Sequence, residues 1–129
     1  RSPISNTFAR YENAVAKKRD HMIKNNKNFF VPWESIHEAN PREIIEKTGK
    51  ASSVPLLVMQ GALDDNVLPS MQEEFVAAWR AAGGSCDFHV FEGAEHEWVA
   101  KPCAQTTAAQ EMAKAFIARQ LAAGRRARC

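Results

Sequence analysis

The sequence predicts an α/β fold in which parallel strands alternate with helices. An almost unbroken apolar run at residues 54–59 (VPLLVM) is typical of a strand that is buried on both faces of a sheet covered by helices. A second strand pattern occurs at residues 86–91 (CDFHVF), and a helical pattern follows each of the two strands. The order strand, helix, strand, helix is typical of crossover units in a parallel sheet.

The helices of this alternating half have recognisable ends. Ser70 and Glu73 have the spacing of a capping box, which predicts a helix start at Ser70. Gly83 and Gly84 are expected to end that helix, since glycine accepts the left-handed conformation at a helix C-terminus. An apolar face that repeats over about residues 104–122 predicts the last helix.

The chain divides into two unlike parts. Residues 1–53 are predicted to form a helical, cap-like insertion with a polar linker, and residues 54–129 the βαβα core. Within the insertion, one amphipathic helix is predicted over about residues 6–27. Its apolar side chains are Phe8, Tyr11, Val15 and Met22. An aromatic loop at residues 29–33 follows, and Pro41 suits the first turn of a further short helix.

Composition and charge narrow the possible functions. The chain has 129 residues, of which 45% are apolar and 25% charged, as in a single globular domain. No apolar run approaches the ~20 residues of a membrane-spanning helix. Residues 51–100 contain one basic and eight acidic side chains, which argues against nucleic-acid binding. The basic run at residues 17–19 is interpreted as solvated surface.

The cysteines indicate neither a disulfide framework nor a zinc site. Cys86, Cys103 and Cys129 are odd in number and have no C-x-x-C spacing. This usage favours a reducing compartment such as the cytoplasm. Cys103 precedes the last predicted helix, and we expect it to be a small buried side chain.

Two loops after the predicted strands contain ionisable side chains. The first, residues 61–69 (GALDDNVLP), contains Asp64 and Asp65, and the second, residues 92–98 (EGAEHEW), contains His96. In open parallel sheets, catalytic groups gather beyond the carboxyl ends of the strands. A carboxylate there can fix the tautomer of an imidazole and stabilise the imidazolium that forms when the ring takes a proton. Ordinary turn chemistry is the alternative explanation of the two aspartates.

The two loops resemble the C-terminal part of an α/β-hydrolase-fold serine hydrolase. The similarity is to esterases and lipases of the acetyl esterase-like and hormone-sensitive-lipase-like kind. In that family, G-x-x-D-x-x-V follows the strand that supplies the acid, and G-x-x-H, often followed by an aromatic residue, supplies the base. The matching residues here are Gly61, Asp64 and Val67, and then Gly93, His96 and Trp98. The order of acid before histidine also agrees.

The resemblance implies a three-layer α/β-hydrolase fold, represented by its last parallel strands, their helices and a helical insertion. It implies hydrolysis of a small-molecule carboxylic ester without a metal or organic cofactor. Asp64 would be the acid of the triad and His96 its base, with Asp64 favoured over Asp65 by its spacing from Gly61. Glu95 and Glu97 flank His96 without a recognised metal-ligand spacing, so no metal site is predicted there.

Two parts of the family's machinery are absent from these residues. The sequence contains no G-x-S-x-G nucleophile motif and no HGGG-type oxyanion segment. We therefore expect a fragment that supplies the acid and the histidine but is inactive alone. The alternative is a non-catalytic fragment or a degenerate hydrolase that acts as a binding module. An in-frame G-x-S-x-G encoded upstream would favour the enzyme.

Aromatic side chains in the insertion are candidates for substrate binding. Phe29, Phe30 and Trp33 lie in the segment that often shapes the substrate site in this family. Core packing explains the same three side chains equally well.

Overall fold

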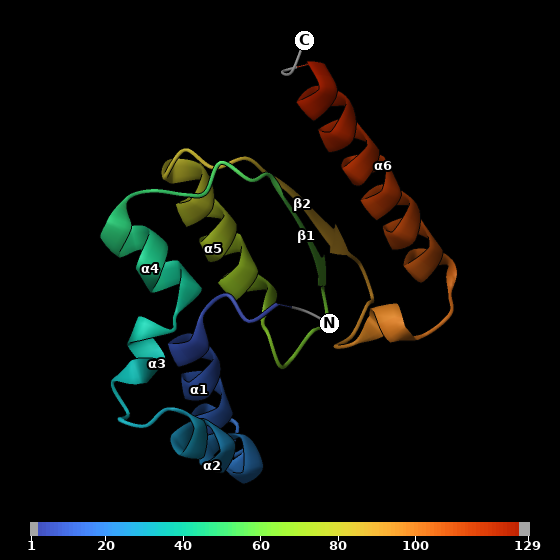
Figure 1. Cartoon of the computed structure of the whole chain (residues 1–129). Coiled ribbons are helices and arrows are strands. Elements are labelled where there is room, and N and C mark those ends of the chain that lie inside the picture. Colours follow the sequence, from blue (N-terminus) through green and yellow to red (C-terminus); the bar gives the residue numbers. More distant parts are fainter. Residues whose placement is uncertain (1–2, 127–129) are drawn as a thin grey trace.

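The computed structural model describes residues 3–126. Six α-helices, two strands and a 3-10 turn are found in this part of the chain. In order they are α1 (Thr7–Ala16), α2 (Asp20–Phe29), α3 (Ser35–Glu38), α4 (Pro41–Thr48), β1 (Leu56–Gly61), α5 (Pro69–Ala81), β2 (Cys86–Phe91), η1 (Trp98–Ala100) and α6 (Ala104–Arg126). Figure 1 shows α4 and α5 on one side of the sheet, α6 on the other, and α1 and α2 beyond one end of the strands.

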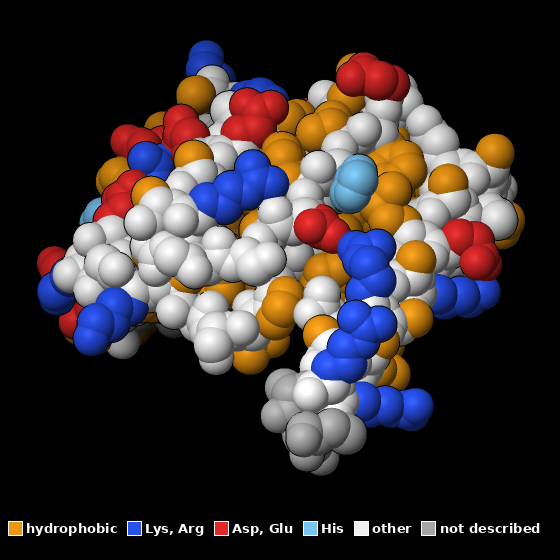
Figure 2. All heavy atoms as spheres, turned by 90° about the horizontal axis from the view of Figure 1, so that it is seen from above, with side chains coloured by type: hydrophobic (Ala, Val, Ile, Leu, Met, Phe, Trp, Pro, Cys, Tyr) orange, Lys and Arg blue, Asp and Glu red, His pale blue; other side chains and the backbone are white. Residues whose placement is uncertain are grey.

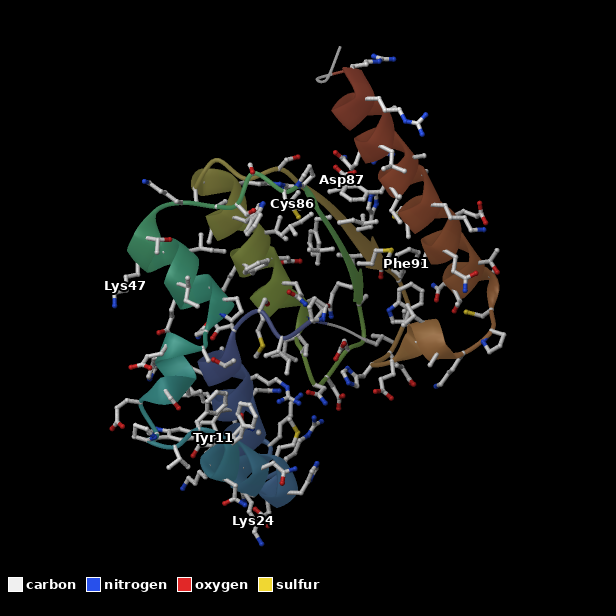
Figure 3. All side chains as sticks on the ribbon, viewed as in Figure 1. Tyr11, Lys24, Lys47, Cys86, Asp87 and Phe91 are labelled. Carbon is white, nitrogen blue, oxygen red and sulfur yellow. The ribbon has the colours of Figure 1, made fainter. Side chains whose placement is uncertain are left out.

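The two strands pair in parallel, as predicted. Leu56 lies opposite Cys86 and Gly61 opposite Phe91, so the strands end at the same edge of the sheet. The strand β2 has the predicted bounds, whereas β1 begins after Pro55, which has no N–H to donate. Beyond Phe91, which Figure 3 labels, the chain turns into the loop before η1. Both candidate loops therefore leave the same end of the sheet.

The helix α5 packs on the sheet and forms the main core with it. The core residues are Ile45, Val58, Val76, Trp79 and Cys86. The helix begins at Pro69, and no side chain caps it. The predicted capping box is therefore wrong: Pro69 occupies the first turn, where a missing N–H costs nothing. The predicted end is confirmed by Gly83, whose φ is +87°.

The prediction of one helix over residues 6–27 is wrong. The side chain of Asn6 caps α1 by accepting a hydrogen bond from the backbone N–H of Ala9, and the helix ends at Ala16. Lys18 then adopts a left-handed conformation with φ 52°, and α2 begins at Asp20. The apolar spacing continues across this turn because α1 and α2 both bury a face, so periodicity alone does not reveal the break.

The helix α6 extends to Arg126, four residues beyond its predicted end, and is buried only near its start. Thr106 and Ala109 are buried, whereas Leu121 is 60% exposed. Figure 2 shows Lys and Arg side chains in a row toward the grey C-terminal residues, beside exposed hydrophobic side chains. None of the helices among residues 3–126 is long and apolar enough to span a bilayer.

The expectation of a buried Cys103 is also wrong. Cys103 lies just before α6 and is exposed, while Cys86 is the buried cysteine and Cys129 lies outside the described residues. The sulfur of Cys103 lies 3.3 Å from the Thr106 hydroxyl oxygen. This hydrogen bond lowers the pKa of the Cys103 thiol, whereas burial raises the pKa of the Cys86 thiol.

Candidate active site

Asp64 and His96, which are 32 residues apart in the chain, meet at the carboxyl end of the sheet. Nδ1 of His96 lies 3.0 Å from each carboxylate oxygen of Asp64. Asp64 is 2% exposed, whereas the His96 side chain is 29% exposed. A buried carboxylate thus orients an imidazole that solvent can still reach. Because the carboxylate engages Nδ1, the second ring nitrogen is the one that can exchange a proton with another group.

The loop after β1 fixes the carboxylate of Asp64. Its Oδ1 atom accepts hydrogen bonds from the backbone N–H groups of Asn66 at 3.0 Å and Val67 at 2.9 Å. The side-chain amide of the buried Gln60 donates to the carbonyl oxygen of Val67 at 2.9 Å, which holds the far end of the loop. Turn chemistry and contact with His96 are therefore both present at Asp64.

Gly61 lies at a close approach of the two loops. A Cβ atom at this position would stand 2.5 Å from the carbonyl oxygen of Ala94. That same oxygen accepts a hydrogen bond from the N–H of Leu63 at 2.9 Å. The first glycine of G-x-x-D is therefore needed because the loop that contains His96 lies directly against it.

Trp98 anchors the loop that contains His96. Its side chain is buried, and its ring centroid lies 4.4 Å from that of Phe91, the last residue of β2. Ala94 and Ala109 complete this small core. The Thr106 hydroxyl donates to the carbonyl oxygen of Lys101 at 2.6 Å and lies 3.3 Å from that of Trp98. The aromatic residue that follows the histidine thus ties its loop to both β2 and α6.

Asp65 points away from His96 and toward the α1–α2 segment. Its carboxylate forms an ion pair with Arg19, and its side chain is 62% exposed. Its backbone oxygen accepts hydrogen bonds from Asn13, Lys17 and Arg19. Lys17 and Lys18 are exposed, as the interpretation of residues 17–19 as solvated surface expects, whereas the Arg19 side chain is only 24% exposed and pairs with Asp65. No motif marks these contacts, since they depend on the turn at Lys18.

The aromatic candidates of the insertion gather around α1. Trp33 packs edge-on against Tyr11 with ring centroids 4.7 Å apart, and Phe30 is 8% exposed. Phe29 is 79% exposed, so core packing does not explain it. It borders a cavity of about 270 Å³ lined by Ile4, Thr7, Arg10, Asn25, Asn26, Phe29 and Phe30. Figure 3 shows Tyr11 on α1, close to α2.

The acidic residues beside His96 form no metal centre in the described part of the chain. Within residues 3–126, no three His, Cys, Asp or Glu side chains are grouped so that they could hold a metal ion. Glu95 instead pairs with Lys101, with a nitrogen–oxygen distance of 3.7 Å.

Comparison with known proteins places this chain in a family. Residues 4–124 match the prolyl oligopeptidase family of peptidases over almost the whole chain. The chain belongs to the prolyl oligopeptidase family. This family has the α/β-hydrolase fold, so the predicted fold and the resemblance to the C-terminal part of a serine hydrolase are both confirmed. No curated protein gives a significant match to the sequence.

Several solved structures that resemble this member of the prolyl oligopeptidase family are of esterase 2 from the planctomycete Thermogutta terrifontis. The native form has 25% identity and a TM-score of 0.54, covering 67% of this chain and 34% of that chain. The propionate-bound form has 26% identity and a TM-score of 0.52, covering 62% of this chain and 29% of that chain. The form phosphoramylated by tabun has 23% identity and a TM-score of 0.57, covering 64% of this chain and 31% of that chain. This chain thus spans about a third of the esterase.

Proposed function

We propose that this chain supplies the acid and the base of a serine hydrolase that cleaves carboxylic esters. A serine hydroxyl from another part of the hydrolase attacks the ester carbonyl, and His96 accepts the proton of that hydroxyl. His96 then donates the proton to the leaving alkoxide. Asp64 orients the ring through Nδ1 and compensates the charge of the imidazolium. The observation that carries the proposal is the 3.0 Å contact between Nδ1 and the buried carboxylate.

The bond that is cleaved has two candidates, an ester and a peptide bond. The similar solved structures favour the ester, since they are of an esterase and one has propionate bound. The family match favours the peptide bond, because the family is one of peptidases. Turnover of a short p-nitrophenyl ester and of the corresponding anilide distinguishes the two. We expect hydrolysis of the ester without hydrolysis of the anilide. A serine peptidase also cleaves the more reactive ester, so cleavage of the anilide is the result that would favour the peptide bond.

We propose Phe29 as a contact for the apolar part of the substrate, with Phe30 and Trp33 shaping the same region. The exposure of Phe29 beside a cavity of about 270 Å³ supports this role. The buried Phe30 borders the same cavity. Trp33 supports the region through its contact with Tyr11 on α1.

A fluorophosphonate probe tests the proposed function in the intact hydrolase. The probe phosphonylates an activated serine and releases fluoride, and the tabun adduct of the Thermogutta esterase involves a related reagent. We expect labelling at a serine outside residues 1–129. His96→Ala should slow labelling ~100-fold or more, because general-base assistance is lost. His89→Ala is the matched control, since His89 is an exposed histidine on β2.

Two results would contradict the proposed function. Stoichiometric labelling of a serine within residues 1–129 would place the nucleophile inside this chain. Labelling of the His96→Ala variant at the wild-type rate would remove His96 from the reaction and would favour a non-catalytic role for the pair.

A further inference from the structure

The loop that follows β1 is held from outside by the α1–α2 segment. Three side chains of this segment donate hydrogen bonds to one atom, the backbone oxygen of Asp65. Their distances to it are 3.3 Å from Nδ2 of Asn13, 3.3 Å from Nζ of Lys17 and 3.2 Å from Nη1 of Arg19. Arg19 also pairs with the Asp65 carboxylate. Hydrogen bonds to charged donors are the stronger kind, and two of these three donors are cations.

A fourth side chain holds the next residue of the loop. Nε of Arg10, on α1, donates to Oδ1 of Asn66 at 2.8 Å. The Arg10 guanidinium is partly buried, and its burial lowers the pKa of the group while attraction to Asp64 opposes this effect. The cation therefore lies near Asp64, the acid of the pair.

The residues that are held in this way are the ones that fix Asp64. The N–H of Asn66 donates to Oδ1 of Asp64, and so does the N–H of Val67. If residues 65 and 66 moved, these N–H groups would no longer point at the carboxylate. The chain of contacts therefore runs from α1 and the α1–α2 turn, through residues 65 and 66, to Asp64 and then to His96.

We propose that Arg10 and Arg19 are positioning residues for the acid of the pair. With Asn13 and Lys17 they keep the backbone of residues 65–66 in the conformation that directs the Asp64 carboxylate at His96. Arg19 also draws the neighbouring carboxylate of Asp65 away from the ring. This inference rests on the proposed function. It gives Arg19 a role in the reaction that is separate from contact with substrate, whereas Arg10 also borders the cavity beside Phe29.

Kinetics of the intact hydrolase with a p-nitrophenyl ester test this inference. Arg19→Met should lower kcat about tenfold, because it displaces the acid and small misplacements of catalytic groups have large effects on rate. KM should stay nearly unchanged, because the substrate site is not displaced. Arg19→Lys should recover most of kcat, since an ammonium group can still bond to Asp65. The double variant Arg10→Met/Arg19→Met should have a lower kcat than either single variant.

Arg42→Met is the matched control. Arg42 on α4 likewise pairs with a carboxylate of another element, Glu74 on α5, and also with Glu46 on its own helix. Its side chain is 29% exposed, against 24% for Arg19, so the two changes remove similar ion pairs at different places. Arg42→Met should leave kcat unchanged, and thermal melting of both variants separates stability from catalysis.

The outcomes separate this inference from the function on which it rests. A normal kcat in Arg19→Met, together with loss of activity in His96→Ala, would overturn the positioning role and leave the proposed function intact. Equal losses of kcat in Arg19→Met and Arg42→Met that parallel equal losses of stability would also overturn it. Normal activity in His96→Ala would overturn both proposals.

Discussion

At the scale of a single residue, Gly61 allows the two loops of the site to pack directly against each other. A Cβ atom there would come within 2.5 Å of the Ala94 backbone oxygen, which cannot move without shifting the loop that contains His96. Gly61→Ala should therefore lower the free energy of unfolding by about 1–3 kcal/mol, as overpacking typically does. Chemical denaturation measures the change.

Gly124→Ala is the control for that measurement. Gly124 lies on α6, and a Cβ atom at this position would meet nothing within 4 Å outside the backbone of its own helix. Alanine should therefore stabilise the helix by about 0.5–1 kcal/mol. Equal stabilities of the wild-type and Gly61→Ala proteins would show that the loops do not approach as closely as the structure indicates.

The residues of the site were predictable where a motif marks them. The glycine spacing indicated Asp64 rather than Asp65, and the structure places Asp64 against His96 while Asp65 contacts Arg19. The contact with Arg19 was not predictable, because it joins residues 46 positions apart through a turn that has no sequence motif. A basic run looks the same in sequence whether water or a loop carbonyl accepts its hydrogen bonds.

At the scale of elements, the turn between α1 and α2 depends on Lys18. Its φ of 52° is a conformation that costs a residue with a side chain about 1 kcal/mol, whereas glycine adopts it freely. Lys18→Gly should therefore preserve or raise the free energy of unfolding, by up to about 1 kcal/mol. Lys18→Val should lower it, because a β-branched side chain fits this region poorly.

Lys24→Gly is the control for the turn. Lys24 lies inside α2, and Figure 3 shows its side chain pointing away from the rest of the molecule. Glycine in a helix interior costs about 1 kcal/mol, so the same change should destabilise the protein at this position. Urea denaturation of the variants checks both signs, and equal destabilisation by Lys18→Gly and Lys24→Gly would contradict the left-handed turn.

The elements were predictable where local patterns agree with the packing. The strand at Cys86–Phe91 and the glycine end of α5 follow directly from such patterns. The start of α5 differs from the predicted start by one residue. Ser70 and Pro69 each favour a helix start, and the helix begins at the proline. The break after α1 was hidden because each helix buries an apolar residue, Ala14 in α1 and Met22 in α2.

At the scale of the whole molecule, parallel pairing of β1 and β2 explains why the site forms. The pairing of Gly61 with Phe91 brings the two loops to one edge of the sheet, and α1 and α2 lie beyond that edge (Figure 1). The α/β order of the chain was enough to predict this meeting. The position of α1 and α2 against the loop after β1 was not predictable, since it is set by tertiary packing.

The central claim is that Asp64 and His96 act as one unit in a serine hydrolase, and a double-mutant cycle tests it most directly. The measurement is kcat/KM for a short p-nitrophenyl ester in the intact hydrolase, with Asp64→Asn, His96→Ala, the double variant and Asp65→Asn. We expect His96→Ala to lose ~10³-fold or more, Asp64→Asn to suffer a similar or smaller loss, and the double variant to be little worse than His96→Ala alone. Asp65→Asn should lose less than about tenfold, because its backbone oxygen still accepts from Arg19. A wild-type kcat/KM in His96→Ala would contradict the account. So would a large loss of kcat/KM in Asp65→Asn together with a nearly normal value in Asp64→Asn.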